Sequence, residues 1–209
     1  MLLQQLTLAD QQIYVFDLQL PVSQRVQRRQ CLDSELTDYF FDNNQLSYIW
    51  HQAGKPAQLR LESIATAYQS TNEQAASNVL VDNYQLAISY GLPLAAVCWS
   101  KQPIGMDMCD TQAFLDMDDT EQQTFCQTYF PDYLDTLQYT QRHGHAKDKY
   151  AQISEQLAKQ WSIYEAKLKF LQRPLQTYSA ELAQAFLPLS EVSQKIITQH
   201  QHFWLTLVC

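Results

Sequence analysis

Two short segments contain the residues whose types and spacing are best suited to chemistry. Residues 102–109 (QPIGMDMC) form an apolar run that holds a single carboxylate, Asp107. Residues 161–169 (WSIYEAKLK) place Glu165 and Lys169 four positions apart, and therefore on one face of a helix. A carboxylate on a strand and another on a nearby helix, with a lysine one turn further, could hold a hard cation such as Mg²⁺ against phosphate oxygens.

Each of these residues also has a simpler interpretation. Asp107 could form a turn or lie on an exposed strand edge. Glu165 and Lys169 could be an ordinary helix-surface pair, which contributes only a few tenths of a kcal/mol. Trp161, one turn before Glu165, is most simply a core residue.

The elements that must position these residues can be predicted from hydrophobic periodicity and from helix-breaking residues. We expect helices at 23–41, at 120–138 with a break at Pro131, and at 147–172. We expect strands at 13–20, 84–89, 94–99, 104–108 and 203–208. Because only short turns separate the strands from 84 to 108, the sequence predicts an antiparallel meander there.

This order of elements predicts an α+β fold with mostly antiparallel sheets. The pattern changes near residues 99–103, so we expect an N-terminal α+β half at 1–100. A C-terminal α+β half would then occupy 101–209 and contain most of the metal-binding and catalytic residues.

The composition is that of a folded protein. The 209 residues (24.3 kDa) are 46% hydrophobic and 17% charged. The first ten residues lack the pattern of a signal peptide, and no apolar run reaches the roughly 18 residues of a membrane span. The five cysteines are scattered without CxxC spacing, which is typical of reduced thiols and argues against a zinc site. We therefore expect a cytoplasmic protein with no membrane partner.

Charge and glycine content narrow the classes of ligand. The net charge of −8 disfavours nucleic-acid binding. Residues 142–173 nevertheless carry seven basic and three acidic side chains, which would suit a small polyanion or an acidic partner, or simply a solvated helix face. Only four glycines are present, in neither GxGxxG nor GxxxxGK[ST], so any phosphate must be held by side chains and a metal.

In chain order, several segments resemble those of the 4′-phosphopantetheinyl transferase family, specifically its longer, monomeric type. The matches run from about Ile13 to Pro174. The strongest is SKQPIGMDM at 100–108, which is similar to the family's SxPIGxDxE segment, and WSIYEAKLK at 161–169 resembles its WSxKEAxxK helix. Shorter matches are RQCL at 29–32, GKP at 54–56 and LAIS at 86–89.

The resemblance implies a fold of two pseudo-related α+β halves with coenzyme A in the cleft between them. The implied reaction transfers 4′-phosphopantetheine from coenzyme A to a serine of an acyl or peptidyl carrier protein. By position, Asp107 and Glu165 would bind Mg²⁺, and Glu165 would help to deprotonate the serine. Lys169 would contact the transferred phosphate, Arg29 would face the adenosine 3′-phosphate, and Lys55 and Ser89 would contact the cofactor.

Three positions depart from the family pattern. Cys109 stands where the family has a second acid, Tyr90 where it has a histidine, and Tyr164 where it has a lysine before Glu165. A thiol is a poor ligand for Mg²⁺, although water can replace a lost ligand. Two other hypotheses therefore stay open: a non-catalytic relative that binds coenzyme A or a carrier protein as a regulator or scaffold, and an unrelated α+β protein.

Overall fold

The computed structural model describes residues 1–18, 25–51, 57–63, 82–144, 148–198 and 201–209. The fold is α+β, as predicted, and all pairings between the described strands are antiparallel. The chain divides into two compact units, Met1–Pro103 (unit 1) and Ile104–Cys209 (unit 2). The sequence had predicted the boundary between the two halves at residues 100 and 101.

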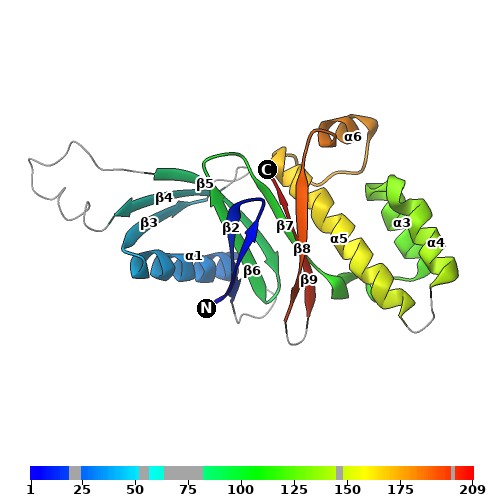
Figure 1. Ribbon diagram of the computed structural model, residues 1–209, viewed down its shortest axis with the longest axis horizontal. Helices are drawn as coiled ribbons and strands as arrows, with labels where there is room; N and C mark the ends of the chain where they lie inside the picture. The colour runs from blue at the N-terminus through cyan, green and yellow to red at the C-terminus, as the bar shows by residue number, and fades with distance from the viewer. Residues whose placement is uncertain (19–24, 52–56, 64–81, 145–147, 199–200) are drawn as a thin grey trace, which may run out of the picture. The chain divides into compact units, whose positions relative to one another are not determined.

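Unit 1 is a six-stranded sheet with one long helix packed against it (Figure 1). The strand order is β1-β2-β6-β5-β4-β3. The strands are β1 (Leu2–Leu8), β2 (Gln11–Asp17), β3 (Gln45–Trp50), β4 (Ala57–Ser63), β5 (Asp82–Gly91) and β6 (Leu94–Ser100). Helix α1 (Arg25–Asp42) buries Leu32, Leu36 and Phe40 in one cluster with sheet residues such as Phe16 and Val97. Burial of this apolar stripe is what holds α1 to the sheet.

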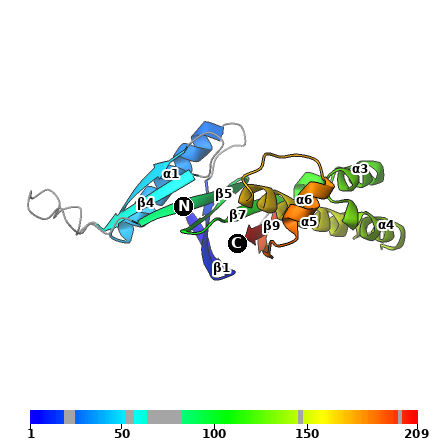
Figure 2. The same cartoon turned by 90° about the horizontal axis from the view of Figure 1, so that it is seen from above.

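Unit 2 has a three-stranded sheet with the order β7-β9-β8, made of β7 (Gly105–Asp110), β8 (Glu191–Ile197) and β9 (His202–Val208). Helix α5 (Lys149–Phe170) packs on β7 and β9, and on its other side it contacts helices α3 (Asp119–Tyr129) and α4 (Leu134–His143). Figures 1 and 2 both show α5 between the sheet and these two helices. Helix α6 (Ala180–Phe186) and the short helices η1 (Thr111–Phe114) and η2 (Pro131–Tyr133) complete the unit.

Most of the expected elements are present, with shifted ends. The helix expected at 120–138 is broken around Pro131, because α3 ends at Tyr129 and α4 begins at Leu134. The expected meander is wrong in its last strand. Strand β6 already pairs with β2 on one side and β5 on the other, so no edge of β6 is open to a further strand. Strand β7 instead pairs with β9, in register Asp107 to Thr206, in the other sheet.

Candidate functional site

The candidate site lies where α5 crosses the beginning of β7. The two backbones approach so closely that a Cβ atom on Gly105 would lie 2.0 Å from the carbonyl oxygen of Ala166 and 2.5 Å from the backbone nitrogen of Phe170. Only glycine fits without a shift of one backbone. Because side chains alternate along a strand, the α5-facing side of β7 presents Gly105, Asp107 and Cys109. The close approach therefore brings the last turns of α5 to Asp107.

Asp107, Glu165 and Lys169 form one cluster. The Lys169 Nζ lies 2.6 Å from Asp107 Oδ1 and 3.7 Å from Glu165 Oε2. The Asp107 side chain is only 5% exposed, whereas those of Glu165 and Lys169 are 26% and 41% exposed. The cluster thus has a buried carboxylate at its base, and a half-buried carboxylate and an ammonium group that reach solvent.

The charges of the cluster are unbalanced, because two carboxylates lie beside a single ammonium group. The pKa of Glu165 is raised to about 7, first by burial and then by the negative charge of Asp107 and a side-chain hydrogen bond with it, while the Lys169 ammonium opposes this shift. One lysine does not neutralise two carboxylates, so at neutral pH Glu165 still holds a proton in a large fraction of the molecules. A second positive charge at this place would release that proton.

The donor chemistry of the two carboxylates fits Mg²⁺, which is usually bound by one or two carboxylates together with water and substrate phosphate. No third protein ligand adds to them: within the described ranges, no group of three or more His, Cys, Asp or Glu side chains is placed to hold a metal. Burial, and then the charges of Asp107 and Glu165, raise the pKa of Cys109, so this group is a neutral thiol and a poor Mg²⁺ ligand.

Asp110 does not supply the missing acid. Its Oδ1 accepts a hydrogen bond from the backbone nitrogen of Gln112 (2.9 Å) and caps η1, and its Oδ2 accepts one from Gln201 Nε2 (3.1 Å). Both contacts lie on the far side of the strand from Asp107, as the alternation of strand side chains requires.

A chain of buried hydroxyl groups supports the same helix–sheet contact. Ser162 on α5 is 2.7 Å from the Thr206 hydroxyl on β9, which is in turn 2.8 Å from the Ser193 hydroxyl on β8. Ser162 and Thr206 are fully buried. These linked hydroxyl groups were not predicted from the sequence, because the three residues are separated by 13 or more positions and none has a distinctive local pattern.

The other predicted residues belong to unit 1. Arg29 is half-buried on α1, Ser89 is buried on β5, and Lys55 lies outside the described residues. The neighbours of the first two are in contact: the guanidinium group of Arg28 lies over the ring of Tyr90, 5.3 Å from its centre. The beginning of α1 and the end of β5 are therefore close together.

The basic residues concentrated at 142–173 are mostly engaged within unit 2. Lys149 pairs with Asp119 (3.3 Å), Lys167 with Glu191 (2.9 Å) and Arg173 with Glu181 (3.1 Å). Lys159 lies over the ring of Trp204. The local excess of positive charge in the sequence is thus largely balanced by neighbouring acids in the fold.

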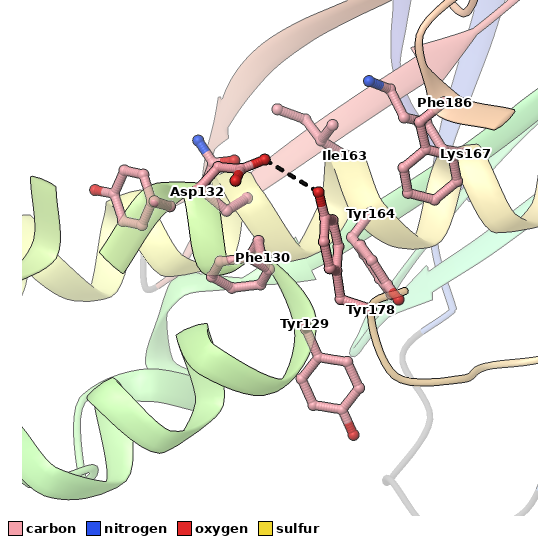
Figure 3. A pocket seen from close by; sticks show the side chains of 10 residues that line it. Tyr129, Phe130, Asp132, Ile163, Tyr164, Lys167, Tyr178 and Phe186 are labelled. Carbon is pink, nitrogen blue, oxygen red and sulfur yellow. Dashed lines mark hydrogen bonds between the residues drawn. The ribbon is translucent and has the colours of Figure 1, made fainter. Parts of the chain in front are cut away.

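Unit 2 also contains a cavity that was not expected from the sequence. The cavity has a volume of about 260 Å³ and is lined by side chains from the end of α3, from η2, from α5 and from the segment around α6, which Figure 3 draws as sticks. Six of its lining residues are aromatic: Tyr129, Phe130, Tyr133, Tyr164, Tyr178 and Phe186. They come from three separate stretches of chain, so no local spacing could have indicated the cavity.

Comparisons with known proteins found no family model and no curated protein that matches this chain. None of the helices in the described ranges is both long and apolar enough to cross a membrane.

Proposed function

We propose that this protein transfers the 4′-phosphopantetheine group from coenzyme A to a serine of an acyl or peptidyl carrier protein in the cytoplasm, as a monomer and with Mg²⁺. The observation that supports this proposal is the cluster of Asp107, Glu165 and Lys169 across the β7–α5 contact. Two carboxylates with one adjoining lysine are the groups that a metal-assisted phosphoryl transfer needs.

Each residue has a distinct task in this reaction. Asp107 and Glu165 would hold Mg²⁺, which neutralises charge on the pyrophosphate when it is bound. The Glu165 carboxylate accepts the proton of the carrier serine, and its pKa of about 7 suits a base at neutral pH. The serine oxygen then bonds to the phosphorus, and the bond from phosphorus to the bridging oxygen breaks to release 3′,5′-ADP. The partly exposed Lys169 binds the transferred phosphate.

The test is an intact-mass assay of apo carrier proteins incubated with the enzyme, coenzyme A and MgCl₂. We expect a carrier to gain the mass of one phosphopantetheine group, and we expect no gain when EDTA replaces the metal. Glu165→Gln is the matched variant, because it keeps the side-chain volume but removes the charge and the base. If no carrier in a panel of acyl and peptidyl types gains mass, the proposal is wrong.

A second candidate is a non-catalytic relative that binds coenzyme A or a carrier protein as a regulator or scaffold. It is favoured by the neutral thiol of Cys109 at the position of the family's second acid, and by Tyr90, which lies under Arg28. Calorimetric titration of coenzyme A with and without Mg²⁺ separates the two functions. Binding that is insensitive to Mg²⁺ and to Glu165→Gln, without transfer to any carrier, favours this second function.

A further inference from the structure

The aromatic cavity lies on the other side of α5 from the carboxylate cluster. Ile163 and Lys167, which line the cavity, are each two positions from Glu165, and two positions correspond to about 200° around a helix. Glu165 and Lys169 point to β7, whereas Ile163, Tyr164 and Lys167 line the cavity in Figure 3. The cavity is therefore a separate place on unit 2 and has no part in the proposed transfer.

Hydrogen bonds fix the segment around Gln176 and Tyr178, which forms one wall of this cavity. The backbone nitrogen of Tyr178 donates to the carbonyl oxygen of Thr128 (2.9 Å), which ties the segment to α3. The hydroxyl of Tyr164 donates to the carbonyl oxygen of Gln176 (2.8 Å), which ties it to α5. The aromatic walls are thus held in place without a ligand, which lowers the cost of binding one.

The charges around the cavity are unequal. The Lys167 Nζ is 2.9 Å from the Glu191 carboxylate, and its side chain is only 14% exposed, so this cation is already neutralised. It also lies over the Phe186 ring, 5.6 Å from its centre, and therefore occupies one face of that ring. Asp132 is exposed, and its Oδ2 accepts a hydrogen bond from the uncharged Tyr178 hydroxyl (3.2 Å, dashed in Figure 3). Asp132 forms no ion pair with any residue in the described part of the chain. Its carboxylate is therefore the uncompensated charge at the cavity.

We propose that this cavity binds a compact organic ammonium ion. Aromatic faces attract a cation through their quadrupoles, and the exposed Asp132 carboxylate adds a complementary charge at the rim. An anion would meet the Asp132 charge and find Lys167 occupied by Glu191. The volume of about 260 Å³ lies below the roughly 300–1,000 Å³ of sites for drug-sized ligands, so the ligand is small.

The test compares choline with the neutral alcohol in which a tert-butyl group replaces the trimethylammonium group. The two probes have nearly the same shape and differ in charge, so the comparison isolates the contribution of the cation. In NMR titrations of the full chain we expect choline to bind about tenfold more tightly, with the largest shifts in Tyr164, Tyr178 and Phe186. Equal affinities, shifts centred elsewhere, or no binding of choline at tens of millimolar would each overturn the proposal.

Two variants locate the charge. Asp132→Asn should reduce the preference for choline to about threefold or less, whereas Asp135→Asn, a nearby exposed acid on α4 that does not line the cavity, should leave it unchanged. Phe186→Leu removes an aromatic ring and should weaken choline more than the neutral alcohol. Glu165→Gln should bind choline normally. Equal effects of the two Asp→Asn variants would show that the attraction is a general surface charge, and the proposal would fail.

Discussion

Both units pack a long helix on an antiparallel sheet, but the two contacts differ in chemistry. In unit 1, α1 presents fully buried apolar side chains to the sheet, among them Leu32 and Leu36. In unit 2, α5 presents Ser162, Glu165 and Lys169 to its sheet in addition to apolar groups. A polar stripe inside a helix–sheet contact costs stability unless every group finds a partner.

This difference favours unit 2 as the place of the proposed chemistry. An apolar contact such as that of α1 needs no explanation beyond folding. The polar contact of α5 departs from the simplest packing solution, and such departures concentrate at functional sites. On this comparison, changes in the α1 contact should lower stability, and changes in the α5 contact should lower the proposed activity.

The largest expected effect is that of Asp107→Ala on phosphopantetheine transfer. Removing the buried oxygen ligand should lower kcat/KM by about a thousandfold, since metal and transition-state charge lose their main support. Cys109→Ala, two positions along the same strand face, should cost less than about threefold because the thiol is neutral. The intact-mass assay gives both rates, and equal losses would place Cys109 among the metal ligands.

Leu32→Ala should separate stability from activity in unit 1. The side chain is fully buried between α1 and the sheet, so its truncation should lower the free energy of unfolding by about 3 kcal/mol. Urea unfolding followed by circular dichroism measures this loss. At low temperature, where the variant stays folded, we expect a rate of transfer close to that of the wild type. A loss of transfer as large as that of Asp107→Ala would remove the functional distinction between the two contacts.

Glu165→Gln should change how stability depends on pH in metal-free protein. The pKa of Glu165 is raised from 4.5 to about 7 in the folded state, so the folded protein binds the extra proton between these values. Wild-type stability therefore falls as pH rises through this window, and the uncharged glutamine avoids that loss. The advantage of the variant should grow by about 2 kcal/mol between about pH 5 and pH 8 in urea titrations with EDTA. A constant difference would mean that the pKa of Glu165 is not raised in the folded protein.

Lys169→Met should strengthen metal binding while it weakens transfer. The ammonium group contacts Asp107 and lies near Glu165, so it competes with a metal ion for the same carboxylates. Its removal should tighten Mn²⁺ binding about tenfold, as measured by electron paramagnetic resonance of free Mn²⁺. Lys167→Met is the control, because that lysine pairs with Glu191 instead. Weaker binding by the Lys169 variant would contradict this competition.

The smallest expected effect is that of Ser162→Ala. Its hydroxyl belongs to the buried chain with Thr206 and Ser193, and its loss should cost about 1 kcal/mol of unfolding free energy. Ser154→Ala is a comparison on the same helix, since the Ser154 hydroxyl also donates to a buried partner, the Thr111 carbonyl oxygen, but lies about three turns from Glu165. Both variants should lose similar stability, and only Ser162→Ala should also slow transfer.

The sequence predicted those features of the fold that depend on local periodicity. The amphipathic stripes of α1 and α5, the break at Pro131 and the β-rich runs of β2, β5, β6 and β9 were all recognisable. Strand β3 was missed because its alternation ends in three consecutive nonpolar residues, Tyr48–Trp50. Strand β4 was missed although residues 57–62 (AQLRLE) alternate strictly between apolar and polar side chains, so its sequence did contain the signal of a half-buried strand.

Local sequence patterns could not predict which strands pair when they are far apart in the chain. The partner of β7 is β9, which lies almost a hundred positions further along the chain, and nothing within residues 104–108 indicates that choice. The spacing of Glu165 and Lys169 predicted their shared face, whereas their contact with Asp107 depends on how α5 crosses β7. The aromatic cavity likewise arises only from tertiary packing.

The pairing of β7 with β9 would make the proposed transfer sensitive to a shift of one residue in strand alignment. Asp107 opposite Thr206 turns its carboxylate to α5; a shift of β7 by one residue would turn it to the opposite face and bring a methionine into its place. We therefore expect a molecule that folds with β7 out of step to lose the proposed transfer even if its helices are intact.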